Sequence, residues 1–248
     1  MFIWSAVLGL SMAGSLGGLL TASLLLLFNQ QARDRVVPWL VSYAVGTLLG
    51  VALLDLVPQA LAVIPPTPVF ATLLAGIFTF FILEKLVIWR HCHDDHACEI
   101  HPSTVSLVIV GDALHTFVDG VVIAAASLVS LPLGVTAALA VAAHEIPQEV
   151  GDFAILLAAG QSRSRALLLN LSSATAGLLG AAAMLVFGSQ APIVLPFVLA
   201  FAAGAFLYVA MADLIPNLHR GGIDRNAARQ TVLIALGVGT IVVMTQVR

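Results

Sequence analysis

Eight long apolar segments run through this chain, with only short polar stretches between them. Each is long enough to cross the roughly 30 Å hydrocarbon core of a bilayer as a helix rising about 1.5 Å per residue. Only 9% of the residues are charged, whereas a soluble domain carries about 25%. The sequence therefore predicts an all-α integral membrane protein that forms a single domain over residues 1–248. The predicted spans are residues 2–28, 37–62, 69–89, 104–129, 132–160, 165–187, 192–218 and 228–247.

Basic side chains lie almost entirely on one side of these predicted spans. Nine of the ten Lys and Arg residues fall in or beside the first, third, fifth and seventh connections, and only Arg248 falls on the other side. Because basic residues favour the cytoplasmic side, both termini are predicted to face outside. The first span has no basic residues ahead of it, so we expect it to be retained and not cleaved as a signal peptide. We expect the membrane to be a bacterial inner (plasma) membrane.

An internal repeat relates an early segment to a late one. Residues 43–61 align without gaps to residues 201–219 and share A-x-G, L-x-V-A and D-L-x-P. The predicted topology runs the second span outward and the seventh inward. Two similar helices in opposite senses indicate an inverted repeat, which is frequent in secondary transporters. The alternative is a chance match between two apolar helices of biased composition.

The fifth span carries ionisable side chains along one face, within an arc of about 140°. Such groups are costly inside a membrane, by roughly 3 kcal/mol each, so they indicate a functional site facing the interior of the bundle. Pro147 lies among them and cannot donate a backbone hydrogen bond, so it is expected to kink the helix. The polar residues of this face are His144, Glu145, Gln148, Glu149 and Asp152.

The fourth span carries a second polar face, whose residues recur at intervals of three or four positions, about one helical turn. They are Asp112, His115, Thr116 and Asp119. His115 and His144 are about equally far from the turn that joins the two spans, so antiparallel packing brings them to one depth. Together with Asp119 and Glu145, they predict a site for Zn²⁺ between the fourth and fifth helices. Fe²⁺, Mn²⁺, Co²⁺ or Cd²⁺ would also be tolerated. The alternative is a buried His–Asp ion-pair network that only holds helices together.

An enzyme is the second function to weigh. H-E-I-P-Q, from His144 to Gln148, is one residue short of the H-E-x-x-H motif of zinc proteases, in which two histidines hold the metal. Gln148 replaces the second histidine, so an intramembrane zinc-dependent protease is the alternative and a non-enzyme is favoured. No catalytic cofactor is expected. The few, dispersed basic residues also argue against a nucleic-acid partner.

The two motifs, H-T-F-V-D-G (115–120) and H-E-I-P-Q-E-V-G-D-F (144–153), closely resemble the signatures of ZIP-family divalent-metal transporters. The most similar subfamily pattern is H-N-x-x-D-G followed by H-E-x-P-H-E-x-G-D. The resemblance implies ATP-independent import of divalent metal, often zinc, by a homodimer in the bilayer, with an elevator-like or rocking movement of one helix group. By position it implies that His115, Asp119, His144 and Glu145 are ligands.

Two positions depart from this family pattern. Thr116 stands where the pattern has asparagine, and Gln148 stands where it has the second histidine. In family members with two adjacent metal positions, those residues contribute to the site. Whether this protein holds one metal ion or two is therefore open.

The remaining intramembrane acids predict a route for the ion. Asp55 lies near the outer end of its span and is expected to mark the entrance. Asp112, Glu149 and Asp152 lie on the cytoplasmic side of the histidines, and Asp213 is expected near the exit. Helix-end capping and packing are the alternative roles for Asp55 and Asp213.

The third connection, residues 90–102, is rich in histidine and cysteine, a composition typical of metal binding. Its spacing does not match a closed zinc-finger site. A reduced cytoplasmic loop that chelates or senses incoming metal is one interpretation, and a merely solvated loop is the other. The residues concerned are His91, Cys92, His93, His96, Cys98 and His101.

Overall fold

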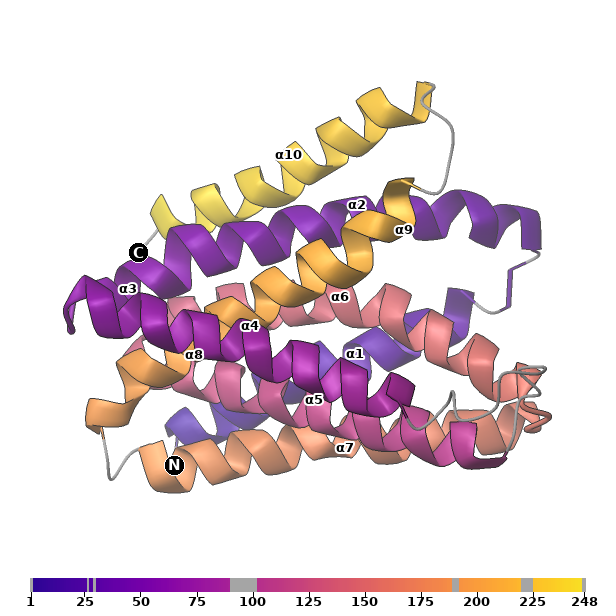
Figure 1. The fold of residues 1–248 in the computed structure, drawn as a ribbon, viewed down its shortest axis with the longest axis horizontal. Helices are drawn as coiled ribbons and strands as arrows, with labels where there is room; N and C mark the ends of the chain where they lie inside the picture. The colour runs from indigo at the N-terminus through magenta and orange to yellow at the C-terminus, as the bar shows by residue number, and fades with distance from the viewer. Residues whose placement is uncertain are drawn as a thin grey trace.

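Helices account for every regular element in the computed structural model, which describes residues 2–25, 27–28, 30–89, 102–188, 192–219 and 225–246. They form eight rods, as the sequence predicts (Figure 1). Two rods are composite, because a short π-helix interrupts each of them. In chain order the rods are α1 (Phe2–Leu25); α2 (Gln30–Val51) with η1 (Ala52–Leu56) and α3 (Val57–Leu61); α4 (Pro66–Trp89); α5 (Pro102–Val129); α6 (Leu131–Ala158); α7 (Arg163–Gly188); η2 (Pro192–Val194) with α8 (Leu195–Tyr208), η3 (Val209–Leu214) and α9 (Ile215–His219); and α10 (Arg225–Gln246).

Seven of these rods, within the described residues, are long and apolar enough to cross a membrane. The eighth is α6, which is 28 residues long but carries the polar face centred on His144 and Glu145. These polar residues lower the mean hydropathy of α6, but its 28 residues are still enough to cross a membrane. The prediction of an all-α membrane protein is confirmed. The helix also continues through Pro147 without interruption.

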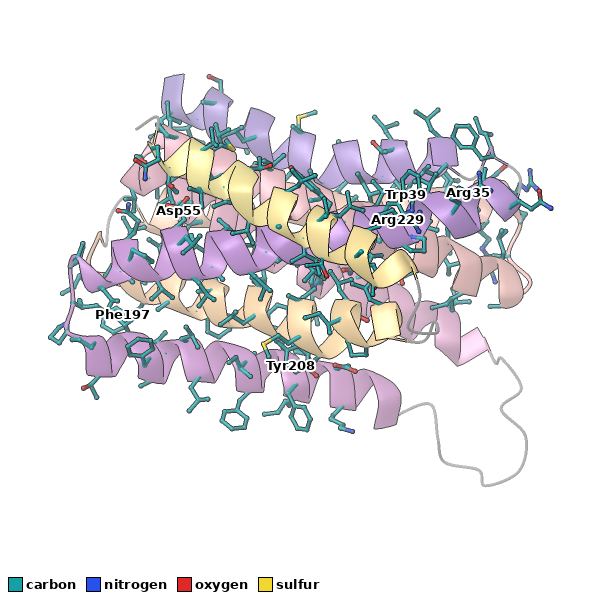
Figure 2. The ribbon with its side chains drawn as sticks, turned by 90° about the horizontal axis from the view of Figure 1, so that it is seen from above. Arg35, Trp39, Asp55, Phe197, Tyr208 and Arg229 are labelled. Carbon is teal, nitrogen blue, oxygen red and sulfur yellow. The ribbon has the colours of Figure 1, made fainter. Side chains whose placement is uncertain are left out.

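Successive rods alternate in direction, so both chain termini lie at one end of the bundle (Figure 1). The opposite end carries the C-terminal end of α4, the N-terminal end of α5 (Figure 1) and the basic side chains Arg35 and Arg229 (Figure 2). There the Arg229 guanidinium lies 4.8 Å from the ring centre of Trp39 and ties α10 to α2. Asp55 lies toward the end with the termini (Figure 2). The end that faces the cytoplasm remains a prediction from the basic residues.

The rods pack as two groups. One contains α1, α5, α6 and α7, with α5 packed most extensively on α7 and α1 on α6. The other contains α2–α3, α4, α8–α9 and α10, with α10 against α2 and α4 against α8. The groups meet mainly where α2 packs on α6 and, less extensively, where α8 packs on α5. Helices of the second group therefore cover one side of the α5–α6 pair that carries the polar residues.

The π-helices η1 and η3 occupy corresponding places in the two aligned segments, and each contains one acid, Asp55 or Asp213. Each ends two residues before a proline, Pro58 or Pro216, which has no N–H to continue the α-helical bonding. The preceding residue bonds five positions back instead of four: Val57 to Ala52, and Ile215 to Ala210. Such π-turns often accompany functional sites. The sequence analysis did not predict them.

Close contact between α5 and α7 depends on glycine. A Cβ added at Gly120 would lie only 1.8 Å from the Gly177 carbonyl oxygen, so a larger residue would force the helices apart. Small residues let membrane helices approach closely in this way. The position of α5 relative to α7 therefore depends on Gly120.

We expect Gly120→Ala to lower the melting temperature of the detergent-solubilised protein. Overpacking costs about 1–3 kcal/mol, which corresponds to roughly 3–10 °C for a chain of this length. Gly9→Ala is the matched control, because a Cβ there meets nothing within 4 Å. It should leave the melting temperature unchanged or raise it slightly, since alanine favours helix. Equal effects of the two substitutions would contradict this packing.

Candidate metal centre

Four side chains from α5 and α6 converge at the middle of the bundle. Each helix is 28 residues long, and His115 and His144 lie at their midpoints. A single non-helical residue, Ser130, joins the helices, and its side-chain oxygen accepts a hydrogen bond from the Leu133 N–H. This tight connection fixes the depth of one helix against the other. The predicted match between the two histidines follows from it.

The distances suit one metal ion. The Nε2 atoms of His115 and His144 are 3.0 Å apart, and Asp119 Oδ2 lies 3.2 Å from His144 Nε2 and 3.6 Å from His115 Nε2. With Glu145 included, one ligand atom from each of the four residues lies within 4.8 Å of every other. Ligands about 2.0–2.1 Å from a tetrahedral zinc ion are separated by about 3.4 Å. The group thus has nearly the spacing that zinc requires.

Burial and unmet hydrogen-bonding capacity favour a metal site over an ion-pair network that only holds helices together. His144 and Glu145 are fully buried, Asp119 is 1% exposed and the His115 side chain is 13% exposed. Asp119 Oδ2 faces the Nε2 atoms of both histidines, whereas neither carboxylate oxygen of Glu145 meets a hydrogen-bond donor. A network that served only to hold helices together would satisfy these oxygens, because unpaired buried charges are costly. A cation among the four residues would satisfy both oxygens of Glu145.

The orientation of His144 is fixed by its second ring nitrogen. Nδ1 lies 2.9 Å from the Ala140 carbonyl oxygen, which can only accept, so Nδ1 carries the proton and donates. In the neutral ring this leaves the lone pair of Nε2 directed at the site, as a metal ligand needs. Nε2 of His144 faces both Nε2 of His115 and Asp119 Oδ2, so any proton shared among these atoms must leave when a metal ion binds.

Two phenylalanines from the second helix group cover the histidines. The Phe80 ring of α4 meets His115 edge-on with ring centres 5.6 Å apart, and Phe206 of α8 meets His144 at 5.9 Å. Phe206 is almost fully buried and Phe80 is 7% exposed. They exclude water from one side of the site and restrain both rings. The sequence analysis missed them, because a phenylalanine within an apolar span carries no distinguishing pattern.

The other predicted residues of α5 and α6 lie beside this group. Thr116 is buried, and its hydroxyl donates to the Asp112 backbone carbonyl at 2.9 Å. Asp112 accepts from Ser173 of α7, and Glu149 is buried. Gln148 and Asp152 are half-buried. The acids thus extend from the four-residue group toward the end of the bundle that carries the basic residues.

Asp55 and Asp213 differ in their surroundings. Asp55 is 1% exposed, and its carboxylate accepts a 2.6 Å hydrogen bond from Thr136 of α6. Asp213 is exposed and lies within electrostatic reach of Asp152. The predicted loop ligands fall outside the described residues: His91, Cys92, His93, His96, Cys98 and His101.

Comparisons with known proteins give a family for this fold and site. The family model described as ZIP Zinc transporter matches residues 89–245. Zinc transporter ZIP13 of Pongo abelii is 34% identical over 223 residues, covering 83% of this chain and 66% of the relative. The chain is also 31% identical to zinc transporter ZIP13 of Mus musculus over 249 residues, which cover 83% of this chain and 69% of the relative. It is 38% identical to zinc transporter ZIP6 of Homo sapiens over 146 residues, which cover 56% of this chain and 19% of the relative.

The chain belongs to the ZIP zinc transporter family, as its two motifs indicated. It spans about two thirds of the ZIP13 relatives and about a fifth of the ZIP6 relative. Membership in a family of transporters leaves the incomplete H-E-x-x-H motif without support as a protease site.

We expect Asp119→Asn to weaken zinc binding to purified protein by more than about 100-fold, because even partners behind a ligand contribute 10–100-fold. The amide keeps the shape but removes the charge. Asp55→Asn is the matched control, a buried carboxylate at the end of the bundle that carries the termini. It should retain the wild-type affinity. Both substitutions are made in a background in which the six histidines and cysteines of residues 90–102 are changed to serine. The zinc affinity of each variant is measured by titration calorimetry. Retained affinity in folded Asp119→Asn would refute the site.

Proposed function

We propose that this chain is a secondary, ATP-independent importer of divalent transition metal ions, with Zn²⁺ as its main substrate. The observation that carries the proposal is the buried group of two imidazoles and two carboxylates at the middle of a membrane bundle. Mixed nitrogen and oxygen ligands suit Zn²⁺ and tolerate Fe²⁺, Mn²⁺, Co²⁺ and Cd²⁺. The names of the relatives, all zinc transporters, point the same way.

We infer a route from the termini end of the bundle to the basic end. Asp152 lies within electrostatic reach of both Asp112 and Asp213, which supports a chain of acids leading inward from the metal group. At the outer end, Asp55 of η1 accepts its hydrogen bond from Thr136 of α6. These residues belong to different helix groups, so opening an entrance there requires this bond to break.

The same proposal includes movement of one helix group against the other. The matching π-helices η1 and η3 support an inverted repeat that relates the two composite rods. The distribution of basic residues supports an orientation with both termini outside the cytoplasm, and the membrane in this proposal is a bacterial inner membrane. The family resemblance adds a homodimer within the lipid bilayer, and a loop at residues 90–102 that chelates or senses incoming metal.

Metal flux into proteoliposomes tests this function. We expect saturable zinc uptake that needs no ATP, competes with other divalent ions and disappears in Asp119→Asn. Calcium provides the comparison ion, because its preference for six to eight oxygen ligands does not match this site. Absence of saturable flux of any tested transition metal, in correctly inserted protein, would rule the transporter out.

Gln148 should set part of the metal preference. Its amide oxygen is a neutral, harder donor than imidazole and therefore tolerates Mn²⁺ or Fe²⁺. We expect Gln148→His to bind zinc more tightly and to narrow the selectivity of transport toward zinc. Competition assays on wild type and variant measure both. A variant with unchanged affinity and selectivity would show that residue 148 does not contact the ion.

A further inference from the structure

Helix α1 packs directly behind Glu145, one of the four residues of the candidate metal centre. The two helices α1 and α6 are in extensive contact, and Gly18 of α1 is buried in it. A Cβ added at Gly18 would lie only 2.7 Å from the Cβ of Glu145, and 3.6 Å and 3.7 Å from its backbone C and Cα atoms. At this point there is room for a glycine and for no larger residue.

The position of α1 against its neighbours is fixed by further contacts. Gly14 lies one turn before Gly18, and a Cβ added there would lie 3.3 Å from Cγ1 of Val141, one turn before the glutamate on α6. Nearer the N-terminus, the Ser11 hydroxyl donates a 3.2 Å hydrogen bond to the Gly177 carbonyl oxygen of α7. Because α1 is held against both α6 and α7, it cannot turn away from α6 without losing these contacts.

Packing matters more for Glu145 than for its neighbour His144. The imidazole of His144 is oriented by the bond between Nδ1 and the Ala140 carbonyl oxygen. No hydrogen-bond donor meets the fully buried Glu145 carboxylate, so its position depends on the atoms that surround its stem. The end of a flexible side chain could yield to a crowding methyl group, but a Cβ is fixed to the backbone of its helix. A side chain at residue 18 would therefore displace the glutamate.

We propose that Gly18 is a positioning residue for the metal centre: its lack of a side chain lets Glu145 stand where its carboxylate reaches the ion that Asp119 and the two histidines bind. The proposal rests on the proposed transport function, in which that ion is the substrate. Gly18 does not touch the ion and acts only through Glu145. Helix α1 thereby becomes part of the metal centre, although it supplies no ligand.

The zinc affinities of three glycine variants of α1 test this role. All are made in the background in which the histidines and cysteines of residues 90–102 are serine, and zinc binding is measured by titration calorimetry. Gly18→Ala should weaken binding at least tenfold, as does loss of a residue that orients a ligand from behind. Gly17→Ala is the matched control, because a Cβ there meets nothing within 4 Å. Gly14→Ala crowds the same pair of helices without touching Glu145. Both should bind zinc as the background does.

A second comparison shows whether Gly18 acts through Glu145. Substitutions that act through one interaction are not additive. Gly18→Ala should therefore cause little further loss of zinc affinity in a chain that already carries Glu145→Gln. The visible absorption of Co²⁺ bound in place of zinc reports the coordination geometry of the site. Gly18→Ala should shift this spectrum toward that of Glu145→Gln, whereas Gly17→Ala should leave it unchanged.

Equal losses from Gly18→Ala with and without the Glu145 carboxylate would show a merely structural role and overturn the proposal. So would background affinity in folded Gly18→Ala, or a tenfold loss in Gly14→Ala. If Gly18→Ala does not fold, Glu145→Gly in the same chain should restore folding, because it removes the opposed Cβ. Failure to restore folding would overturn the contact. Zinc uptake by wild-type proteoliposomes, measured in parallel, separates these outcomes from failure of the transport function.

Discussion

The fold depends on the pairing of α5 with α6 across Ser130. A connection of one residue leaves almost no freedom to slide one helix along the other, so His115 and His144 must meet. The hydrocarbon environment makes this pairing consequential, because polar groups there have no water and must find partners inside the bundle. The second helix group then closes the site with the rings of Phe80 and Phe206.

Much of the fold follows from the sequence because its signals are local. The lengths of the apolar spans predict the eight rods. The short turn at Ser130 predicts that the two histidines lie at the same depth. The convergence of His115, Asp119, His144 and Glu145 was predictable as well, because helical spacing places His115 over Asp119 and the turn at Ser130 pairs the two helices.

What the sequence could not predict depends on contacts between distant segments. Phe80 and Phe206 acquire their roles from neighbours that are close only after the helices pack. The burial of Asp55 is similar, since its partner Thr136 is 81 residues away. The π-helices fall between these cases. Pro58 and Pro216 signal interrupted bonding, but the choice between a kink and a π-turn depends on packing.

The central claim is that two imidazoles and two carboxylates hold the metal. X-ray absorption of the zinc-loaded protein, with the six loop histidines and cysteines changed to serine, tests it most directly. We predict a first shell of nitrogen and oxygen near 2.0–2.1 Å, with outer-shell scattering from two imidazole rings that falls to one in His144→Ala. A shell without imidazole scattering, or a spectrum unchanged by His144→Ala, would contradict the account.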